Sequence, residues 1–229
     1  MPQRSKVALE PRRSPVQARS TASVDAILEA TVQVLLRVGK ERLTTTRVAS
    51  RAGVSVGTLY QYFPNKSALL QAVLRRHFDS VTGAVERACK EQTGRTLREM
   101  ATALVNAFLE AKMQDVKTSI ALYSVSSDVD GAKVVQQVGA RMNKAIVQML
   151  TSSSQPLMTD PSLVAFMLQG AMAGLSRRLL ESAGAEKQFE TLRRELIFLA
   201  RAYLGACSAR LPIPAAGDLK YEIGFRSPL

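Results

Sequence analysis

Apolar residues recur at three- and four-residue spacing along nearly the whole chain, and this spacing constrains the fold more than any other feature. Strand-like alternation of apolar and polar residues is scarce. Since such spacing places side chains on one face of a helix, each segment can bury that face against its neighbours. The sequence therefore predicts an all-α fold. A chain of 229 residues is long enough to bury a core in one or two domains.

Helix start and stop signals divide the first ninety residues into four helices. The first is expected over residues 23–38 and ends at Gly39, where a left-handed cap is expected. Two short helices follow, near 45–52 and 56–63, joined by a tight turn at Gly53. A long helix comes next. The boundaries rest on capping residues and a helix breaker: Thr44, Ser55, Pro64 and Asn65.

The rest of the chain predicts five more helices after a boundary near residues 91–95. Thr96 and Glu99 form a capping box at the start of the first, and Asp160-Pro161 opens the fourth. The later helices are expected over 116–124, 131–150, 161–183 and 187–209. We therefore expect a flexible basic arm at 1–22, a small helical domain at 23–82, a helical bundle at 83–210 and an irregular tail at 211–229.

The positive charge is concentrated at the N-terminal end. Residues 1–80 hold 13 Lys and Arg against 5 Asp and Glu, a net charge of +8, and the remainder contributes +4 to the total of +12. Such an end attracts polyanions by counterion release, so DNA, RNA or an anionic membrane are candidate partners. A merely basic, well-solvated protein is the alternative.

Other classes of function have little support. The only histidine, His77, has no placed nucleophile or carboxylate partner in the sequence, and no phosphate loop or metal-ligand spacing occurs. We therefore expect no enzyme, cofactor or metal site. Cys89 and Cys207 lie far apart, which favours a reducing cytoplasm, and we expect no secretion signal and no membrane span. The expected location is the cytoplasm, in association with the nucleoid.

Two short helices joined by a glycine turn describe a helix-turn-helix, here over residues 44–63. Leu59 and Phe63 lie four residues apart and can face a core. The opposite face lacks long charged side chains and includes a glycine, so another surface could approach the backbone closely. This outer face consists of Val56, Gly57, Tyr60 and Gln61. A recognition helix lying in the major groove would have this character.

This segment resembles the DNA-binding domain of the TetR family of regulators. Stretches 43–49, 51–55 and 57–66, followed by Leu69 and Leu70, agree with it in order, spacing and residue type. The resemblance extends from about Ile27 to Val73, and the C-terminal two-thirds is similar only in length and helical character. Val24 departs from the pattern, because many members carry a charged residue at the start of the first helix.

The resemblance implies a role for each matching position. Residues at the start of the first short helix would bind phosphates, and Arg47 would reach a phosphate or a guanine edge. Residues at the start of the second would meet base edges and thymine methyls, and the tyrosine hydroxyls would bind phosphates. Alternatively, the tyrosines could pack against the core without binding DNA. For Arg47, the alternative is a solvent-exposed position without a DNA contact. The predicted DNA-binding set is Thr44, Thr45, Thr46, Arg47, Ser55, Val56, Gly57, Thr58, Tyr60, Gln61, Tyr62 and Lys66.

Seven of the eight methionines follow residue 99, and methionine adapts to irregular cavities. TetR-like regulators use such cavities for inducers, so we predict a small-molecule effector pocket, with ordinary core packing as the alternative. The predicted pocket residues are Met100, Phe108, Met113, Tyr123, Met142, Phe166 and Met167.

The resemblance also implies a homodimer formed through the last two long helices. Gly170 and Gly174 lie inside one of these helices, where glycine lowers helix stability by about 1 kcal/mol relative to alanine. Close packing of two helices at an interface would offset this cost. Glycines tolerated inside one subunit's core are the alternative. The predicted interface residues are Gly170, Gly174, Leu196 and Tyr203.

These inferences predict a ligand-responsive repressor that leaves a near-palindromic double-stranded operator when a small, largely apolar effector binds. A DNA-binding architectural or cell-division factor with the same fold and no effector is the alternative. The arm carries three arginines that could enter the minor groove: Arg12, Arg13 and Arg19. Alternatively, the arm could be disordered and have no role in binding.

Overall fold

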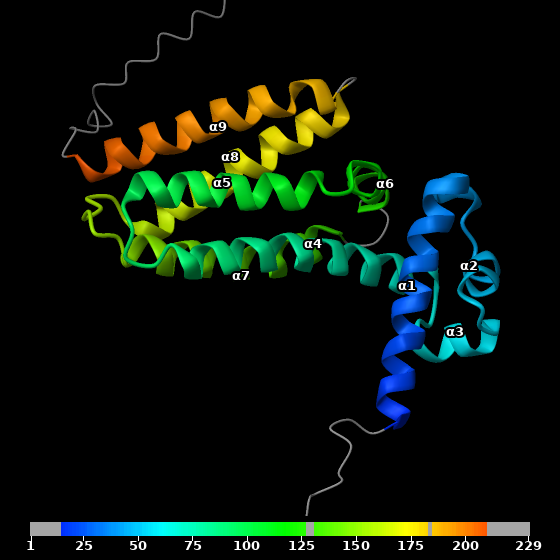
Figure 1. Ribbon diagram of the computed structural model, residues 1–229. Coiled ribbons are helices and arrows are strands. Elements are labelled where there is room, and N and C mark those ends of the chain that lie inside the picture. Colours follow the sequence, from blue (N-terminus) through cyan, green and yellow to red (C-terminus); the bar gives the residue numbers. More distant parts are fainter. Residues whose placement is uncertain (1–14, 127–130, 183–184, 210–229) are drawn as a thin grey trace, which may run out of the picture. The chain divides into compact units, whose positions relative to one another are not determined.

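A computed structural model describes residues 15–126, 131–182 and 185–209. Nine α-helices and no strand occur within these ranges, which confirms the all-α prediction (Figure 1). The helices are α1 (Pro15–Arg42), α2 (Thr45–Ala52), α3 (Val56–Tyr62), α4 (Lys66–Glu91), α5 (Leu97–Met113), α6 (Val116–Ser126), α7 (Gly131–Thr151), α8 (Pro161–Glu181) and α9 (Ala185–Ser208). Arg12, Arg13 and the predicted tail at 211–229 lie outside the described residues.

Helix α1 begins at Pro15 rather than at Ser23, so residues 15–22 of the predicted flexible arm are helical. Proline is well placed in the first helical turn, because its missing N–H has no intrahelical partner there. At the other end, Gly39 interrupts the helical backbone with φ 75° and ψ 170°. The positive φ at this glycine is as predicted.

The described chain forms two compact units. The N-terminal unit comprises residues up to Gly83 together with Glu110–Arg141, and the C-terminal unit comprises Ala84–Leu109 and the residues from Met142 onward. Helix α4 contributes to both. The sequence predicts residues 110–141 in the C-terminal bundle, and the structure differs on this point. They pack elsewhere because α6 lies against α1, and apolar side chains of α6 and α7 join the N-terminal core: Leu122, Val125, Val134 and Val138.

The core of the N-terminal unit holds α1, α2 and α3 together. Ile27 of α1, Val48 of α2 and Leu59 of α3 are fully buried and belong to one apolar cluster. Asn65 caps the next helix, since its side-chain oxygen accepts a hydrogen bond from the Ala68 N–H at 2.8 Å. Local capping and shared burial therefore place the two short helices against α1 and the start of α4.

In the C-terminal unit, α8 and α9 pack side by side (Figure 1). The predicted capping box is present, because the Thr96 N–H donates to Glu99 Oε2 at 3.0 Å and the Glu99 N–H donates to Thr96 Oγ1 at 3.3 Å. Asp160 caps α8 by accepting from the Ser162 N–H at 3.1 Å. None of the described helices has both the length and the apolar character needed to span a bilayer.

A buried polar network lies inside the N-terminal unit. Lys112 is 3% exposed, donates to Tyr123 Oη, and lies over the rings of Tyr123 and Phe78. The Ser119 hydroxyl donates a hydrogen bond to the Lys112 carbonyl at 3.0 Å, and its Oγ lies 3.3 Å from His77 Nε2. Because that hydroxyl proton is already used, Nε2 of neutral His77 is the donor to Ser119. This serine is not arranged as a nucleophile activated by the histidine.

Burial of the network disfavours its charged forms. Desolvation, followed by the charge of Lys112, lowers the pKa of His77 to about 4, while Asp115 acts in the opposite direction. Desolvation also lowers the pKa of Lys112 to about 8. The folded N-terminal unit therefore holds His77 neutral at physiological pH.

We expect the free energy of unfolding to fall by about 2 kcal/mol between about pH 7 and about pH 5. The unfolded chain binds a proton at its ordinary histidine pKa of 6.5, whereas folded His77 resists protonation down to about 4. Urea unfolding at several pH values measures this loss. His77→Gln removes the chain's single histidine and should flatten the dependence over this range. An equally steep loss in the variant would assign it to other groups.

Candidate nucleic-acid interface

Helix α2 begins at a capped and firmly packed end. Thr44 has an extended backbone, and its side-chain oxygen accepts a hydrogen bond from the Arg47 N–H at 3.3 Å. Val48 and Ala49 are buried one turn further along. The first N–H groups of a helix have no intrahelical partner, and Thr46 at this helix start is exposed, so an anion can bind there.

Gly53 makes the turn between α2 and α3. Its φ of 69° and ψ of 28° place it in the left-handed region, as predicted. The Gly53 N–H donates to the Ser50 carbonyl at 3.3 Å, and the Val54 N–H donates to the Ala49 carbonyl at 3.0 Å. These bonds satisfy the last carbonyls of α2 while the chain turns toward α3.

Helix α3 is capped at both ends. The Ser55 hydroxyl accepts from the Thr58 N–H at 3.0 Å, and the Phe63 N–H donates to the Leu59 carbonyl at 2.9 Å. Leu59 is fully buried, and Phe63 is 9% exposed. The inward face of α3 is therefore the one that the sequence predicted.

The outer face of α3 is exposed and uncharged. Val56 is 36% exposed and Tyr60 is 48% exposed, with Gly57 and Gln61 also at the surface. Thr45 Oγ1 lies 3.2 Å from Tyr60 Oη, so one hydrogen bond joins α2 to α3 at this surface. A Cβ at Gly57 would meet only Ser55 Oγ, at 3.7 Å, among the described atoms. Packing within the chain therefore does not require a glycine here.

Other predicted DNA-binding residues lie differently. Lys66 is half-buried, and its Nζ donates to the Lys40 carbonyl at 2.8 Å, which ties the start of α4 to the end of α1. Tyr62 is partly buried against the core, which supports the packing alternative.

Arg47 and Thr46 are exposed, and the Arg47 guanidinium donates to the Arg42 carbonyl at 2.9 Å. The residues around Arg47 form an arginine-rich groove between α1 and α2. The sequence does not predict this groove, because a count of charges finds an excess of basic residues without locating them in space.

The predicted effector residues are divided between the two units. Met100, Phe108 and Met142 are buried in the C-terminal unit, whereas Met113 and Tyr123 belong to the N-terminal unit. Phe166 and Met167 were predicted to line an interior cavity, but their side chains are 66% and 51% exposed. They point outward because the buried face of α8 is formed by their neighbours: Val164, Ala165, Leu168 and Met172.

The four residues predicted for the dimer interface differ in their exposure. Gly170 and Gly174 are exposed, and no atom outside their own helix turns would lie within 4 Å of a Cβ at either, so they do not lie inside one subunit's core. Leu196 is 1% exposed and packs within its own chain, contrary to a purely intersubunit position. Tyr203 is half-buried and lines an apolar groove of about 540 Å³. Two exposed apolar residues of the same groove, Phe198 and Leu199, are not among the residues predicted from the sequence.

Comparisons with known proteins agree with this geometry. The family described as bacterial regulatory proteins, tetR family, matches residues 27–73, and the tetracyclin repressor-like C-terminal domain matches residues 96–204. The HTH-type transcriptional repressor KstR of Rhodococcus jostii is 31% identical over 129 residues, which cover 56% of this chain and 59% of that repressor. The chain thus spans about three fifths of the length of this relative.

Two further relatives cover more of the chain. An uncharacterized HTH-type transcriptional regulator of Mycobacterium tuberculosis is 28% identical over 160 residues, 66% of this chain and 80% of that protein. The nucleoid occlusion factor SlmA of Photobacterium profundum is 22% identical over 170 residues, 72% of this chain and 87% of that factor.

A crystal structure of a transcriptional regulator from Rhodococcus superposes with a TM-score of 0.65 at 20% identity, over 82% of this chain and 98% of that one. At this identity the superposition shows the fold. The two family matches at their expected places, together with the capped helix-turn-helix, establish that the chain belongs to the TetR family of transcriptional regulators.

Proposed function

We propose that this regulator represses transcription by binding a near-palindromic operator as a homodimer, and that a small, largely apolar effector releases it. The outer face of α3 carries the proposal. It is exposed and uncharged, and it includes a glycine that packing within the chain does not require. A surface of this kind suits a recognition helix whose backbone approaches base edges.

The two short helices divide the contacts between them. Val56, Gly57 and Thr58 lie at the start of α3, where small side chains can meet base edges and thymine methyls. The Thr45 and Tyr60 hydroxyls are held together beside them and suit a phosphate oxygen. The start of α2 adds free N–H groups to the same phosphate contact.

Gly57→Ala should raise the melting temperature slightly and weaken DNA binding. Alanine favours a helix over glycine by up to about 1 kcal/mol, and the chain leaves room for its methyl group. On DNA, the same methyl group would hold α3 away from the base edges. Titration of a duplex that the wild-type protein selects from a random-sequence library measures the affinity.

Ser80→Ala is the control for helix propensity, because Ser80 is an exposed helical residue of the same unit and lies outside the proposed DNA surface and the proposed dimer face. It should raise stability without affecting DNA binding. Wild-type affinity in Gly57→Ala would place α3 outside the closest part of the interface.

Dimerisation is supported by an apolar surface that one chain leaves uncovered. Leu163, Phe166 and Met167 of α8 and Phe198 of α9 are at least half exposed, which is costly for a surface in water. Gly170 and Gly174 continue the same face of α8 with no side chain of their own. A second copy would cover these residues and bring two α3 helices to half-sites about 34–36 Å apart, or a multiple of that spacing.

Gly174→Leu should convert the dimer into a monomer or a misaligned dimer and weaken operator binding. Gly174 is exposed and no neighbouring side chain lies within 4 Å of a Cβ at this position, so the fold of each subunit should persist. A tightly packed interface, in contrast, has no room for it. Sedimentation and circular dichroism measure assembly and helix content. Lys144→Leu, at an exposed position of α7, controls for the added apolar surface. A Gly174→Leu dimer with normal operator affinity would remove this face from the interface.

Effector binding is supported by the interior of the C-terminal unit. Met100, Phe108 and Met142 are buried there and can adapt to an apolar ligand. The buried side-chain oxygens of Asn106 and Asn143 accept no hydrogen bond from the described residues. A ligand that offers a hydroxyl or amide donor would satisfy such an acceptor, whose isolation in a protein interior is costly.

An effector found by thermal-shift screening of apolar metabolites should raise the melting temperature and lower operator affinity. Linkage requires reciprocity, so saturating DNA should weaken effector binding by the same factor. Calorimetry with and without the duplex measures both affinities. A ligand that stabilises the protein but leaves DNA affinity unchanged would contradict induction. That result would favour the alternative of an architectural or cell-division factor.

A further inference from the structure

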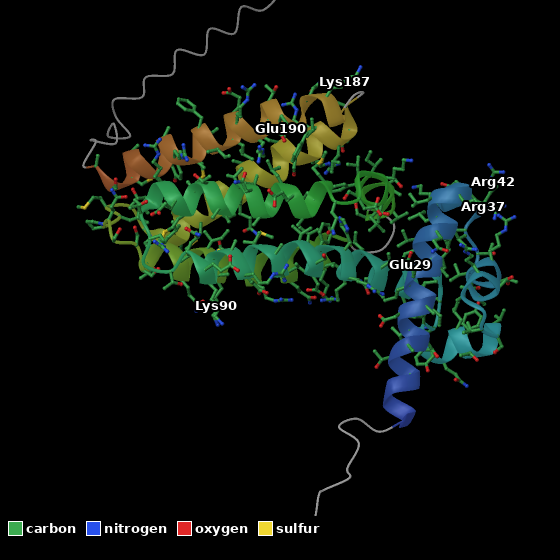
Figure 2. The ribbon with its side chains drawn as sticks, viewed as in Figure 1. Glu29, Arg37, Arg42, Lys90, Lys187 and Glu190 are labelled. Atoms are coloured by element: carbon green, nitrogen blue, oxygen red, sulfur yellow. The ribbon has the colours of Figure 1, made fainter. Side chains whose placement is uncertain are left out.

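A groove of about 870 Å³ runs between α1 and α2 of the N-terminal unit. Four exposed arginines line it: Arg37, Arg42, Arg47 and Arg51. Figure 2 shows Arg37 and Arg42 projecting from the C-terminal end of α1 toward the side on which α2 lies. The groove therefore gathers cationic side chains from two helices that the turn at residues 43–44 connects.

Two of these arginines are held in place by hydrogen bonds to uncharged groups. The Arg51 Nε donates to Gln33 Oε1 at 2.6 Å, and Gln33 Nε2 in turn donates to Glu29 Oε1 at 3.1 Å. The Arg47 guanidinium donates to the Arg42 carbonyl. Each of these two guanidiniums keeps further N–H donors for an external acceptor, and its position is already fixed.

The charge of the groove is not neutralised from within. No aspartate or glutamate is among the residues that the structure places along it. Elsewhere in the same unit, carboxylates do pair with arginines, as Asp25 does with Arg76 at 3.1 Å and Asp79 with Arg141 at 2.6 Å. Four guanidiniums without a carboxylate attract an anion with several charges.

The groove lies on the side of α2 away from α3. Thr45 contacts Tyr60 of α3, whereas Arg47 and Arg51 bond to residues of α1. In a helix-turn-helix complex, the first helix crosses the sugar-phosphate backbone while the second lies in the major groove. A DNA strand that crosses α2 from the side of α3 would therefore continue toward the arginine groove.

We propose that the arginine groove binds backbone phosphates of the operator strand that lie outside the base pairs read by α3. This site rests on the proposed function and extends it to DNA flanking the half-site. Phosphate matches the forked donors of arginine. An acidic protein segment fits less well, because the groove's apolar residues, Val34 and Val38, are buried or half-buried and offer no exposed anchor.

The test compares wild-type protein with the double variant Arg37→Gln/Arg51→Gln on a duplex that the wild-type protein selects from a random-sequence library. Each phosphate contact contributes about 0.9 to the slope of log affinity against log salt, so the double variant should flatten it by about 1.8. At about 0.15 M salt this corresponds to about 30-fold weaker binding. Preference among base sequences should not change, because phosphates carry no sequence information.

Removing the outer base pairs of the duplex provides a second readout. The wild-type protein should lose affinity on the shortened duplex, whereas the double variant should lose much less, because it no longer contacts those phosphates. Arg37→Lys/Arg51→Lys keeps the charge and should retain most of the slope.

Lys117→Gln/Lys133→Gln removes the same charge from the same unit, at exposed positions of α6 and α7, and is the matched control. An equal change of slope in this control, or an unchanged slope in Arg37→Gln/Arg51→Gln, would overturn the groove assignment. So would equal losses by both proteins on the shortened duplex. Failure of the wild-type protein to select any duplex would instead contradict the proposed function itself.

Discussion

The left-handed backbone at Gly53 is the constraint on which the helix-turn-helix depends. It lets two N–H groups return to the last carbonyls of α2 while the chain reverses toward Ser55. A side chain would strain this conformation by about 1–2 kcal/mol. With the turn set, Val48 and Leu59 bury on the same side. The opposite side of α3 is then left to solvent, and this is the surface that the proposed function uses.

Helix α2 separates two surfaces of different chemistry. The outer face of α3 is small and uncharged, whereas the groove on the other side of α2 holds four arginines. This division suits DNA recognition, because base edges discriminate only at short range while phosphates supply affinity for any sequence. Long cations on α3 would bind phosphates wherever they occurred. Because the arginines lie on the other side of α2, the outer face of α3 is free of this sequence-independent attraction to phosphates.

Both units bury polar groups, and the C-terminal unit also exposes an apolar face. In the N-terminal unit, half-buried His77 and buried Lys112 have partners in Ser119 and Tyr123, so desolvation alters their pKa values without leaving them isolated. The N-terminal unit has one buried oxygen without a described partner, Thr82 Oγ1. The C-terminal unit holds two buried amide oxygens without a described partner, and it leaves an apolar face open to water. Each costs free energy in an isolated chain. A ligand and a second subunit are the partners that would remove these costs, which is why the proposal assigns them to this unit.

Local features of the fold were predictable because their causes lie within a few residues. Capping by Thr44 and Ser55, the positive φ at Gly53 and the inward direction of Leu59 follow from short-range hydrogen bonds and helical spacing. The order and spacing of residues 27–73 likewise sufficed to indicate the family. Helical spacing shows which residues share a face, but not what that face meets. Tertiary packing therefore decided that residues 110–141 join the N-terminal unit, that Phe166 faces outward and that Leu196 faces inward. It also created the arginine groove, because Arg37 and Arg51 belong to different helices and meet only where nonlocal burial packs α2 against α1.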